Sequence, residues 1–278
     1  MDLTKYIDWD SLVRNEKLSE TFIIENAENL GWNKIFRYQT LSEDFIRQFG
    51  HRVDWTLISV HQKLSEALIR DFQYKVNWDM IATYQQLSED FIREFQAVLN
   101  LGLICIRQKL STDFIREFQD VINFEHIAMY QKLSEKAILE FYWRKIPRLD
   151  EHIKIICTHQ ILSEKFITDY FIMFMSNVDW EIISQYQVLS EDFIRKNQLK
   201  VHWDKISQYQ KLSEDFITEF SDRVNWGLII KHQKVSSELV ARFKGSINWL
   251  KAIKESDIPT EFVIANIDHV IKQIKARF

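Results

Sequence analysis

The fold is decided by a stretch that the chain repeats: Val76-Asn77-Trp78-Asp79-Met80-Ile81-Ala82-Thr83-Tyr84-Gln85-Gln86-Leu87-Ser88-Glu89-Asp90-Phe91-Ile92-Arg93-Glu94-Phe95. Asn77 is a good helix N-cap, so we predict a short helix A from Trp78 to about Gln85. Ser88 is a second N-cap, followed by acidic residues in the first helical turn, and helix B is predicted to continue to about Phe95. Each copy of this stretch is therefore predicted to form a pair of short helices.

Copies of the stretch occupy most of the chain. Its serine recurs at a spacing of 23 residues, broken by one spacing of 29 and one of 27: Ser19, Ser42, Ser65, Ser88, Ser111, Ser134, Ser163, Ser190, Ser213 and Ser236. In a diverged eleventh copy Pro259 replaces the serine. This is compatible with a helix start, because proline is tolerated in the first turn of a helix. A large apolar anchor stands ten residues before each of these positions: Trp9, Trp32, Trp55, Trp78, Leu101, Phe124, Ile153, Trp180, Trp203, Trp226 and Trp249.

Neither predicted helix is stable alone, because isolated helices shorter than about 12–15 residues are marginal in water. Each carries one apolar stripe at helical spacing, which only neighbouring helices can cover. We therefore predict an all-α protein, an α-solenoid of about eleven short helix-turn-helix repeats. The two long spacings predict an irregular joint near residues 141–180. It separates an N-terminal array (1–140) from a C-terminal array with its cap (181–278), within a single solenoid spanning 1–278.

Glycine and proline are scarce, with five and two residues in the chain. β-Hairpins, β-sandwiches and phosphate-binding loops need these residues at their turns, so the scarcity argues against β-rich folds, Rossmann domains and P-loop NTPases. The sequence contains no Ser/His/Asp set, HExxH or CxxC, and its carboxylates recur at helix starts in nearly every repeat. We predict no catalytic residue, no metal site and no cofactor, and hence no enzymatic activity.

The formal net charge of −4 provides no general basic field for nucleic acid or acidic lipid. No apolar run approaches the ~18 residues of a membrane span, and the start of the chain shows no secretory signal. Cys105 and Cys157 occupy a position where other repeats place serine or alanine, so both are predicted to pack in the core. These features predict a cytoplasmic protein without a membrane partner.

Two polar positions recur near the end of helix A. Glutamine is predicted to turn into the seam between helices and bond backbone groups at the A–B turn: Gln39, Gln62, Gln85, Gln108, Gln131, Gln160, Gln187, Gln210 and Gln233. The preceding residue is Tyr, His or Arg at the rim of the buried stripe: Tyr38, His61, Tyr84, Arg107, Tyr130, His159, Tyr186, Tyr209 and His232. These rim side chains either roof the core or line a groove that contacts a partner.

Helix B carries an outward column of arginines at Arg47, Arg70, Arg93 and Arg116. Such a column can bind phosphates or acidic peptides. Acidic residues follow most of these arginines directly, which favours a charge-balanced, solvated face. The sequence leaves both interpretations open, so the four arginines are candidate partner-binding residues.

Positions two and five residues after the anchor of helix A are predicted to face outward. They are polar or charged near both ends of the chain and apolar in the middle: Leu57, Val60, Met80, Leu103, Ile106, Met129, Ile155 and Ile182. An exposed apolar stripe marks either a partner site or extra packing inside a tight superhelix. We predict a partner-binding site made of the first six of these residues and two neighbouring tyrosines, Tyr84 and Tyr130.

The repeat unit Val-Asn-Trp-Asp-x-Ile-Ser-x-Tyr-Gln-Lys-Leu-Ser-Glu-Asp-Phe-Ile-x-Glu-Phe, clearest at residues 201–220 and 76–95, resembles short tandem helical repeats in proteins of giant amoeba-infecting viruses and some large phages. The resemblance covers roughly residues 7–265, and the joint departs from it. It implies a viral protein in the host cytoplasm, and it implies no particular activity.

Together these observations predict a non-enzymatic helical-repeat interaction protein, or scaffold, that binds a protein partner such as a host factor. Solenoids offer extended surfaces and little catalytic machinery. Two alternatives stay open. Repeat helices can read a nucleic-acid strand base by base, and one array could pack on another to form a homo-oligomer.

Overall fold

The computed structural model describes residues 6–143, 149–172, 179–256 and 258–276. Every regular element within these ranges is a helix, and helices that are close in the sequence pack against one another in order. The predicted all-α solenoid architecture is therefore confirmed. The chain divides into two compact units, unit 1 (Met1–Gln131) and unit 2 (Lys132–Phe278).

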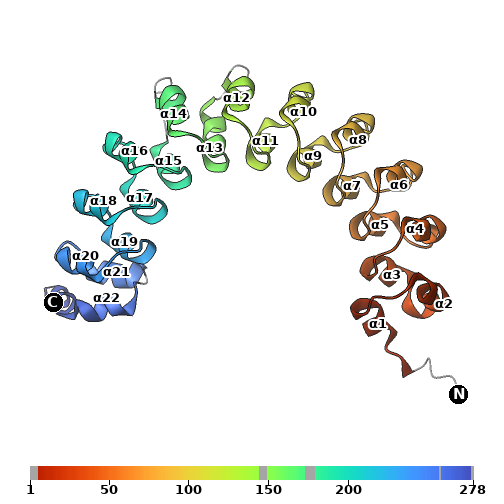
Figure 1. Cartoon of the computed structure of the whole chain (residues 1–278), viewed down its shortest axis with the longest axis horizontal. Helices are drawn as coiled ribbons and strands as arrows, with labels where there is room; N and C mark the ends of the chain where they lie inside the picture. The colour runs from red at the N-terminus through yellow and green to blue at the C-terminus, as the bar shows by residue number, and fades with distance from the viewer. Residues whose placement is uncertain (1–5, 144–148, 173–178, 257, 277–278) are drawn as a thin grey trace. The chain divides into compact units, whose positions relative to one another are not determined.

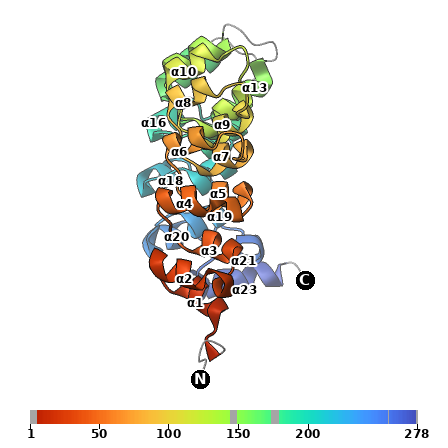
Figure 2. The same cartoon turned by 90° about the vertical axis from the view of Figure 1, so that its right-hand side faces the viewer.

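Unit 1 consists of alternating A and B helices. Its A helices begin at the anchors: α1 (Trp9–Asn15), α3 (Trp32–Tyr38), α5 (Trp55–His61), α7 (Trp78–Tyr84), α9 (Leu101–Arg107) and α11 (Phe124–Tyr130). Its B helices begin after the serines: α2 (Glu20–Leu30), α4 (Glu43–Phe49, followed by the 3-10 turn η2, Gly50–Arg52), α6 (Glu66–Asp71), α8 (Glu89–Glu94) and α10 (Thr112–Glu117). Within this unit the A helices form the inner row and the B helices the outer row (Figure 1), and Figure 2 shows α4, α6, α8 and α10 stacked in sequence.

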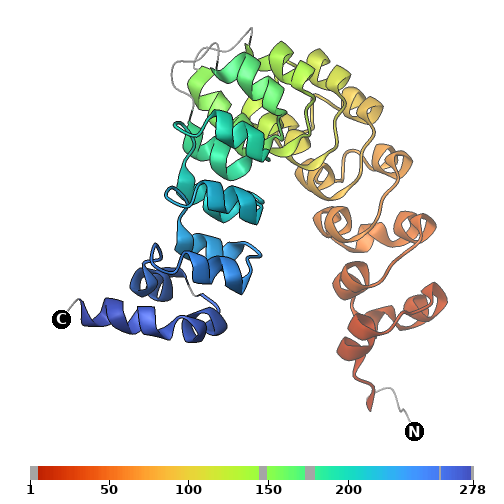
Figure 3. The same ribbon diagram turned by 60° about the vertical axis from the view of Figure 1, so that its left-hand side comes forward.

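Unit 2 follows the same alternation. Its A helices are α13 (Leu149–His159), α15 (Trp180–Tyr186), α17 (Trp203–Tyr209), α19 (Trp226–His232) and α21 (Trp249–Ser256). Its B helices are α12 (Glu135–Ile138), α14 (Glu164–Phe166), α16 (Glu191–Lys196), α18 (Glu214–Glu219), α20 (Ser237–Arg242) and α22 (Thr260–Ala265). One further helix, α23 (Ile267–Lys275), packs against α21 and is the last helix of the unit, drawn in dark blue in Figure 3.

The two longer repeat spacings coincide with a change of helix type. α12 runs on into the π-helix η3 (Leu139–Trp143), and α14 runs on into the π-helix η4 (Ile167–Ile172). A π-helix accommodates extra residues within a helical path, which suits an insertion at these places. The parts of the predicted joint at residues 144–148 and 173–178 lie outside the described residues.

Side-chain caps begin most of the helices, as predicted. The Ser88 hydroxyl accepts a hydrogen bond from the backbone N–H of Phe91 (3.1 Å), and the Asn77 side-chain oxygen accepts one from Met80 (3.1 Å). His202 occupies the cap position of α17, where most repeats have Asn or Asp, but its side chain makes no cap bond. Caps favour the short side chains of Ser, Thr, Asp and Asn, which can fold back onto the first turn, and the longer imidazole does not do so here.

The core of a repeat is built on its anchor ring. The Trp78 ring packs against Phe95, the residue that ends helix B of the same repeat, with 4.9 Å between ring centroids. Phe95 in turn packs on Phe91 at 4.7 Å, and Ile81 and Ile92 beside them are fully buried. Removing this apolar surface from water, at about 25 cal/mol per Å², is the main favourable term that holds the short helices together.

The recurring glutamines join each repeat to the one before it. Gln85 Oε1 accepts from the backbone N–H of Leu64 (2.9 Å), and Nε2 donates to the carbonyl oxygens of Ser59 (2.8 Å) and Gln62 (2.7 Å). These are the groups left unpaired where helix A of the preceding repeat ends. The same three bonds recur at Gln39, Gln62, Gln108, Gln131, Gln187, Gln210 and Gln233. The predicted role of the glutamines is confirmed.

The glutamate that follows most of the repeat serines makes a second link, which the sequence did not reveal. Glu66 Oε1 accepts from the backbone N–H of Ser88 in the next repeat (2.6 Å), and Glu43 does the same for Ser65 (2.9 Å). The sequence pointed only to a favourable interaction of this glutamate with the helix dipole. The recurring glutamine and glutamate are therefore engaged in links between successive repeats.

Candidate partner-binding surface

The side of the A helices that faces away from the B helices is defined by the positions two and five residues after each anchor. We call this surface, on unit 1, the A face. From α5 to α11 it contains six apolar side chains of the predicted site: Leu57, Val60, Met80, Leu103, Ile106 and Met129. The first five are half-buried, and Met129 is 36% exposed. The structure therefore brings these six residues onto one side of four consecutive A helices.

One member of the wider apolar stripe is not exposed. Ile182 of α15 in unit 2 was expected to be exposed, but it is buried, with only 8% of its surface accessible. Helical angle alone fixes the direction in which a side chain leaves its own helix. Neighbouring A helices, which pack side by side along the array, decide how much of that side chain water still reaches.

A row of aromatic rings borders the A face. Tyr84 is 57% exposed and Tyr130 is 52% exposed, and Tyr38 at the equivalent position of α3 is 38% exposed. His61 and Arg107 occupy the same position on α5 and α9 and are also exposed. Tyrosine offers a large, rigid ring with a polar tip, which is the composition of side chains that contribute most at protein interfaces.

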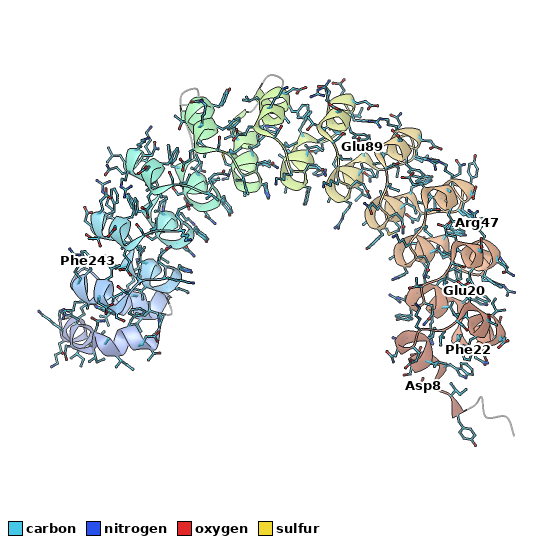
Figure 4. All side chains as sticks on the ribbon, viewed as in Figure 1. Asp8, Glu20, Phe22, Arg47, Glu89 and Phe243 are labelled. Atoms are coloured by element: carbon cyan, nitrogen blue, oxygen red, sulfur yellow. The ribbon has the colours of Figure 1, made fainter. Side chains whose placement is uncertain are left out.

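The four arginines of the predicted site lie elsewhere. Arg47, which Figure 4 labels, belongs to α4 in the outer row, and it forms an ion pair with Asp71 of the next repeat. Arg70 and Arg93 pair in the same way with Glu94 and Glu117, at 2.8 Å each, and Arg116 pairs with Asp113 on its own helix. The structure therefore separates the predicted residues into an apolar group on the A face and a charge-balanced group of arginines on the B helices, which we call the B face.

Because the B-face ion pairs are exposed, we expect them to contribute little to stability. Arg93→Ala should lower the melting temperature slightly in dilute buffer, and the difference from the unchanged chain should shrink as salt is added, because salt screens exposed charges. Thermal melts followed by circular dichroism at low and high salt check this. A large, salt-independent loss would mean that Arg93 stabilises the fold by packing.

The predicted site leaves out the cations that lie on the A face near the start of unit 1. Arg14 (α1) and Lys34 (α3) both pair with Asp10, at 3.0 and 2.7 Å. The hydrogen bond from Lys34, which is the largest contribution, lowers the pKa of the Asp10 carboxyl, so Asp10 stays ionised at neutral pH. Arg37 lies over the Tyr38 ring at 5.8 Å. The A face of unit 1 is thus cationic at α1 and α3 and mostly apolar beyond them, where Thr83 and His126 are its two polar residues.

The two cysteines are buried, as predicted. Burial raises the pKa of the Cys105 thiol to about 11 and that of Cys157 to about 12, so both remain protonated at neutral pH. Only the thiolate is a strong nucleophile. We expect alkylation by iodoacetamide at pH 8 to be roughly 100-fold slower in the folded chain than in denaturant. Mass spectrometry of the time course measures this, and rapid labelling of the folded chain would contradict the packing described.

Within the described residues, no three His, Cys, Asp or Glu side chains gather closely enough to hold a metal ion. No helix in that part of the chain is both long and apolar enough to cross a membrane.

The fold and its surface define a helical-repeat protein of the α-solenoid class. Comparison with protein-family models, curated proteins and solved structures finds no match to this chain.

Proposed function

We propose that this chain is a non-enzymatic interaction protein that binds a protein partner across the A face of unit 1. One observation carries the proposal: half-exposed aliphatic side chains occupy four consecutive A helices beside a row of exposed tyrosines. The recurring glutamines and glutamates already have a structural role, because they bond successive repeats together. The aliphatic side chains of the A face have no such role that would explain why they are exposed. Contiguous apolar surface rimmed by polar residues is characteristic of protein interaction sites.

The energetics of such a surface suit a protein ligand. Each aliphatic side chain that a partner covers gains about 25 cal/mol for every Å² of apolar surface removed from water. Tyr84 and Tyr130 lose little conformational entropy on binding, because a tyrosine has only two rotatable side-chain bonds. The resemblance to viral repeats extends the proposal to a viral protein that engages a host factor in the host cytoplasm.

The two alternatives predict different behaviour. Nucleic-acid binding rests on contacts between phosphates and unpaired cations, but the arginine column of unit 1 is engaged in ion pairs. Self-assembly through the A face would cover the same aliphatic side chains with a second copy. Light scattering at high concentration distinguishes self-assembly from binding of a different partner. A chain that binds a different partner stays monomeric, and a self-assembling chain does not.

Photo-crosslinking tests where the partner binds. A photoreactive phenylalanine analogue is placed at Tyr84, on the rim of the A face, or at Tyr74, which is 95% exposed in the turn between α6 and α7. The full chain is then irradiated in a host-cell lysate. We expect a discrete protein adduct from position 84 and none from position 74. Equal adducts from both positions, or adducts from position 74 alone, would refute the proposed surface.

A further inference from the structure

The two rows that form the A face contain no carboxylate. In unit 1 they comprise positions two and five after the anchor on each of six A helices, and none of these residues is Asp or Glu. The chain as a whole has 40 acidic residues among 278 and a net charge of −4. In unit 2 the same two rows also lack carboxylates and carry four lysines: Lys205, Lys231, Lys251 and Lys254. Acidic residues are thus absent from these two rows of an acidic protein, and the carboxylates that flank them in unit 1 stand one residue after the anchor, at Asp10, Asp79 and Glu125.

The charges that remain in the rows of unit 1 are all positive and lie at one end. They are Arg14, Lys34 and Arg37, on α1 and α3. The flanking carboxylate of Asp10 pairs with the first two, and among the described residues no carboxylate pairs with Arg37. Three cations therefore face one anion, in contrast to the B face, where Arg47, Arg70, Arg93 and Arg116 each have an acidic partner. This end of the A face has positive charge left for an anionic ligand.

From general helix geometry, the apolar part of the rows is expected to match the side-chain spacing of an α-helix. Packed helices lie 8–10 Å apart, and the two rows on one A helix, being three residues apart, lie about 5–6 Å apart. Along an α-helix, residues seven apart are separated by about 10.5 Å, so a helix laid along the stack would place one such residue over each A helix. Its a and d side chains would follow the two rows, which is the helix-in-groove mode of recognition.

From these observations we infer that the A face of unit 1 binds an amphipathic α-helix with aliphatic residues at heptad spacing and an acidic segment at one end. This inference rests on the proposed function and adds the chemistry of the partner. The aliphatic positions of the helix pack over α5 to α11, and its carboxylates meet Arg14, Lys34 and Arg37. A nucleic acid would place phosphates over Leu57, Met80 and Leu103, where the rows offer no positive charge, so the observations favour a protein helix.

A display library of segments of natural proteins, roughly 40 residues each, tests the inference with the full chain immobilised. We expect the recovered segments to share aliphatic heptads that adjoin a cluster of Asp and Glu. They should bind the Met80→Glu, Leu103→Glu double variant at least roughly 30-fold more weakly, the change expected when central apolar contacts are lost. Val98→Glu with Val121→Glu is the matched control, because Val98 and Val121 are 51% and 65% exposed in the turns that follow helix B of unit 1.

The charge contribution is tested separately, with the most enriched segment and fluorescence anisotropy. Arg37→Glu should weaken binding by about tenfold near 50 mM salt, and by less at higher salt, because the interaction is screened. Lys75→Glu, in the turn between α6 and α7, is the same change of charge away from the A face and should have no effect. Equal effects of the two substitutions would overturn the role of the cationic end.

The outcomes separate the inference from the proposed function. If the double variant abolishes binding but the segments show neither heptads nor acidic clusters, the inference fails and the proposed surface stands. If no segment is recovered, or if the double variant binds the segments as tightly as the unchanged chain, both fail. Binding of a labelled mixed-sequence single-stranded RNA that is lost in the double variant would also overturn the inference, in favour of nucleic acid.

Discussion

Replacing Gln85 with alanine should lower the free energy of unfolding by about 3 kcal/mol, because an N–H and two carbonyl groups of the preceding repeat lose their partners. All three groups lie at the end of helix A of the preceding repeat, where they contact the buried Gln85 side chain. Water therefore cannot take the place of the lost amide without opening a gap between the two repeats. For a unit of this size the loss corresponds to roughly 10 °C in melting temperature. Thermal and denaturant unfolding followed by circular dichroism measure it.

The neighbouring residue provides a matched control. Gln86 is the same residue type one position further along the chain, but it is exposed. Gln86→Ala should therefore change the free energy of unfolding by no more than about 0.5 kcal/mol, as is usual for surface substitutions. Similar losses at Gln85 and Gln86 would show that the recurring glutamine does not join the repeats as described.

Placing glutamates on the A face is expected to abolish partner binding while the fold persists. The Met80→Glu, Leu103→Glu double variant introduces two charges among aliphatic side chains, and burying them under a partner would require desolvation without compensation. We expect affinity for the partner recovered by crosslinking to fall at least roughly 30-fold, which corresponds to about 2 kcal/mol. Both side chains are half-buried and solvent still reaches them, so helical circular dichroism should be retained.

The Val98→Glu, Val121→Glu variant makes this result interpretable. It adds the same two charges at apolar, exposed positions of the same unit, on a different edge. Full binding by this variant together with loss in the A-face variant would assign the effect to the surface. If both variants bind equally well, the A face is not the binding site. If the A-face variant also loses its helical signal, single substitutions at Met80 and Leu103 replace the pair.

Much of the fold follows directly from the repeat. Capping by Ser88 and Asn77, the ends of both helices and the role of Gln85 were predictable, because caps and buried amides obey local rules that hold in every copy. The link from Glu66 to Ser88 was not, because it joins residues 22 positions apart, and its existence depends on how closely two B helices approach. Sequence periodicity gives the order of the helices and leaves such distances undetermined.

The candidate site was predicted only in part. Leu103 and Met80 were identified because they are apolar where the helical angle points outward, and the structure brings them together. Arg93 was grouped with them because no sequence rule shows that its carboxylate partner, Glu117, comes from the next repeat. Lys34 and Arg37 were recognised in the sequence as outward-facing charges, but the absence of carboxylates from their two rows was not, although it is a property of the sequence alone.

The A-face methionines allow the most direct test of the central claim, which is that the A face of unit 1 is the binding surface. Met80 and Met129 are two of the five methionines in the chain, and their methyl groups can be labelled with ¹³C and assigned through Met80→Leu and Met129→Leu. We predict that adding the crosslinked partner, or a segment recovered from the library, shifts the methyl resonances of Met80 and Met129. A complex that forms while both A-face resonances stay in place would contradict the account.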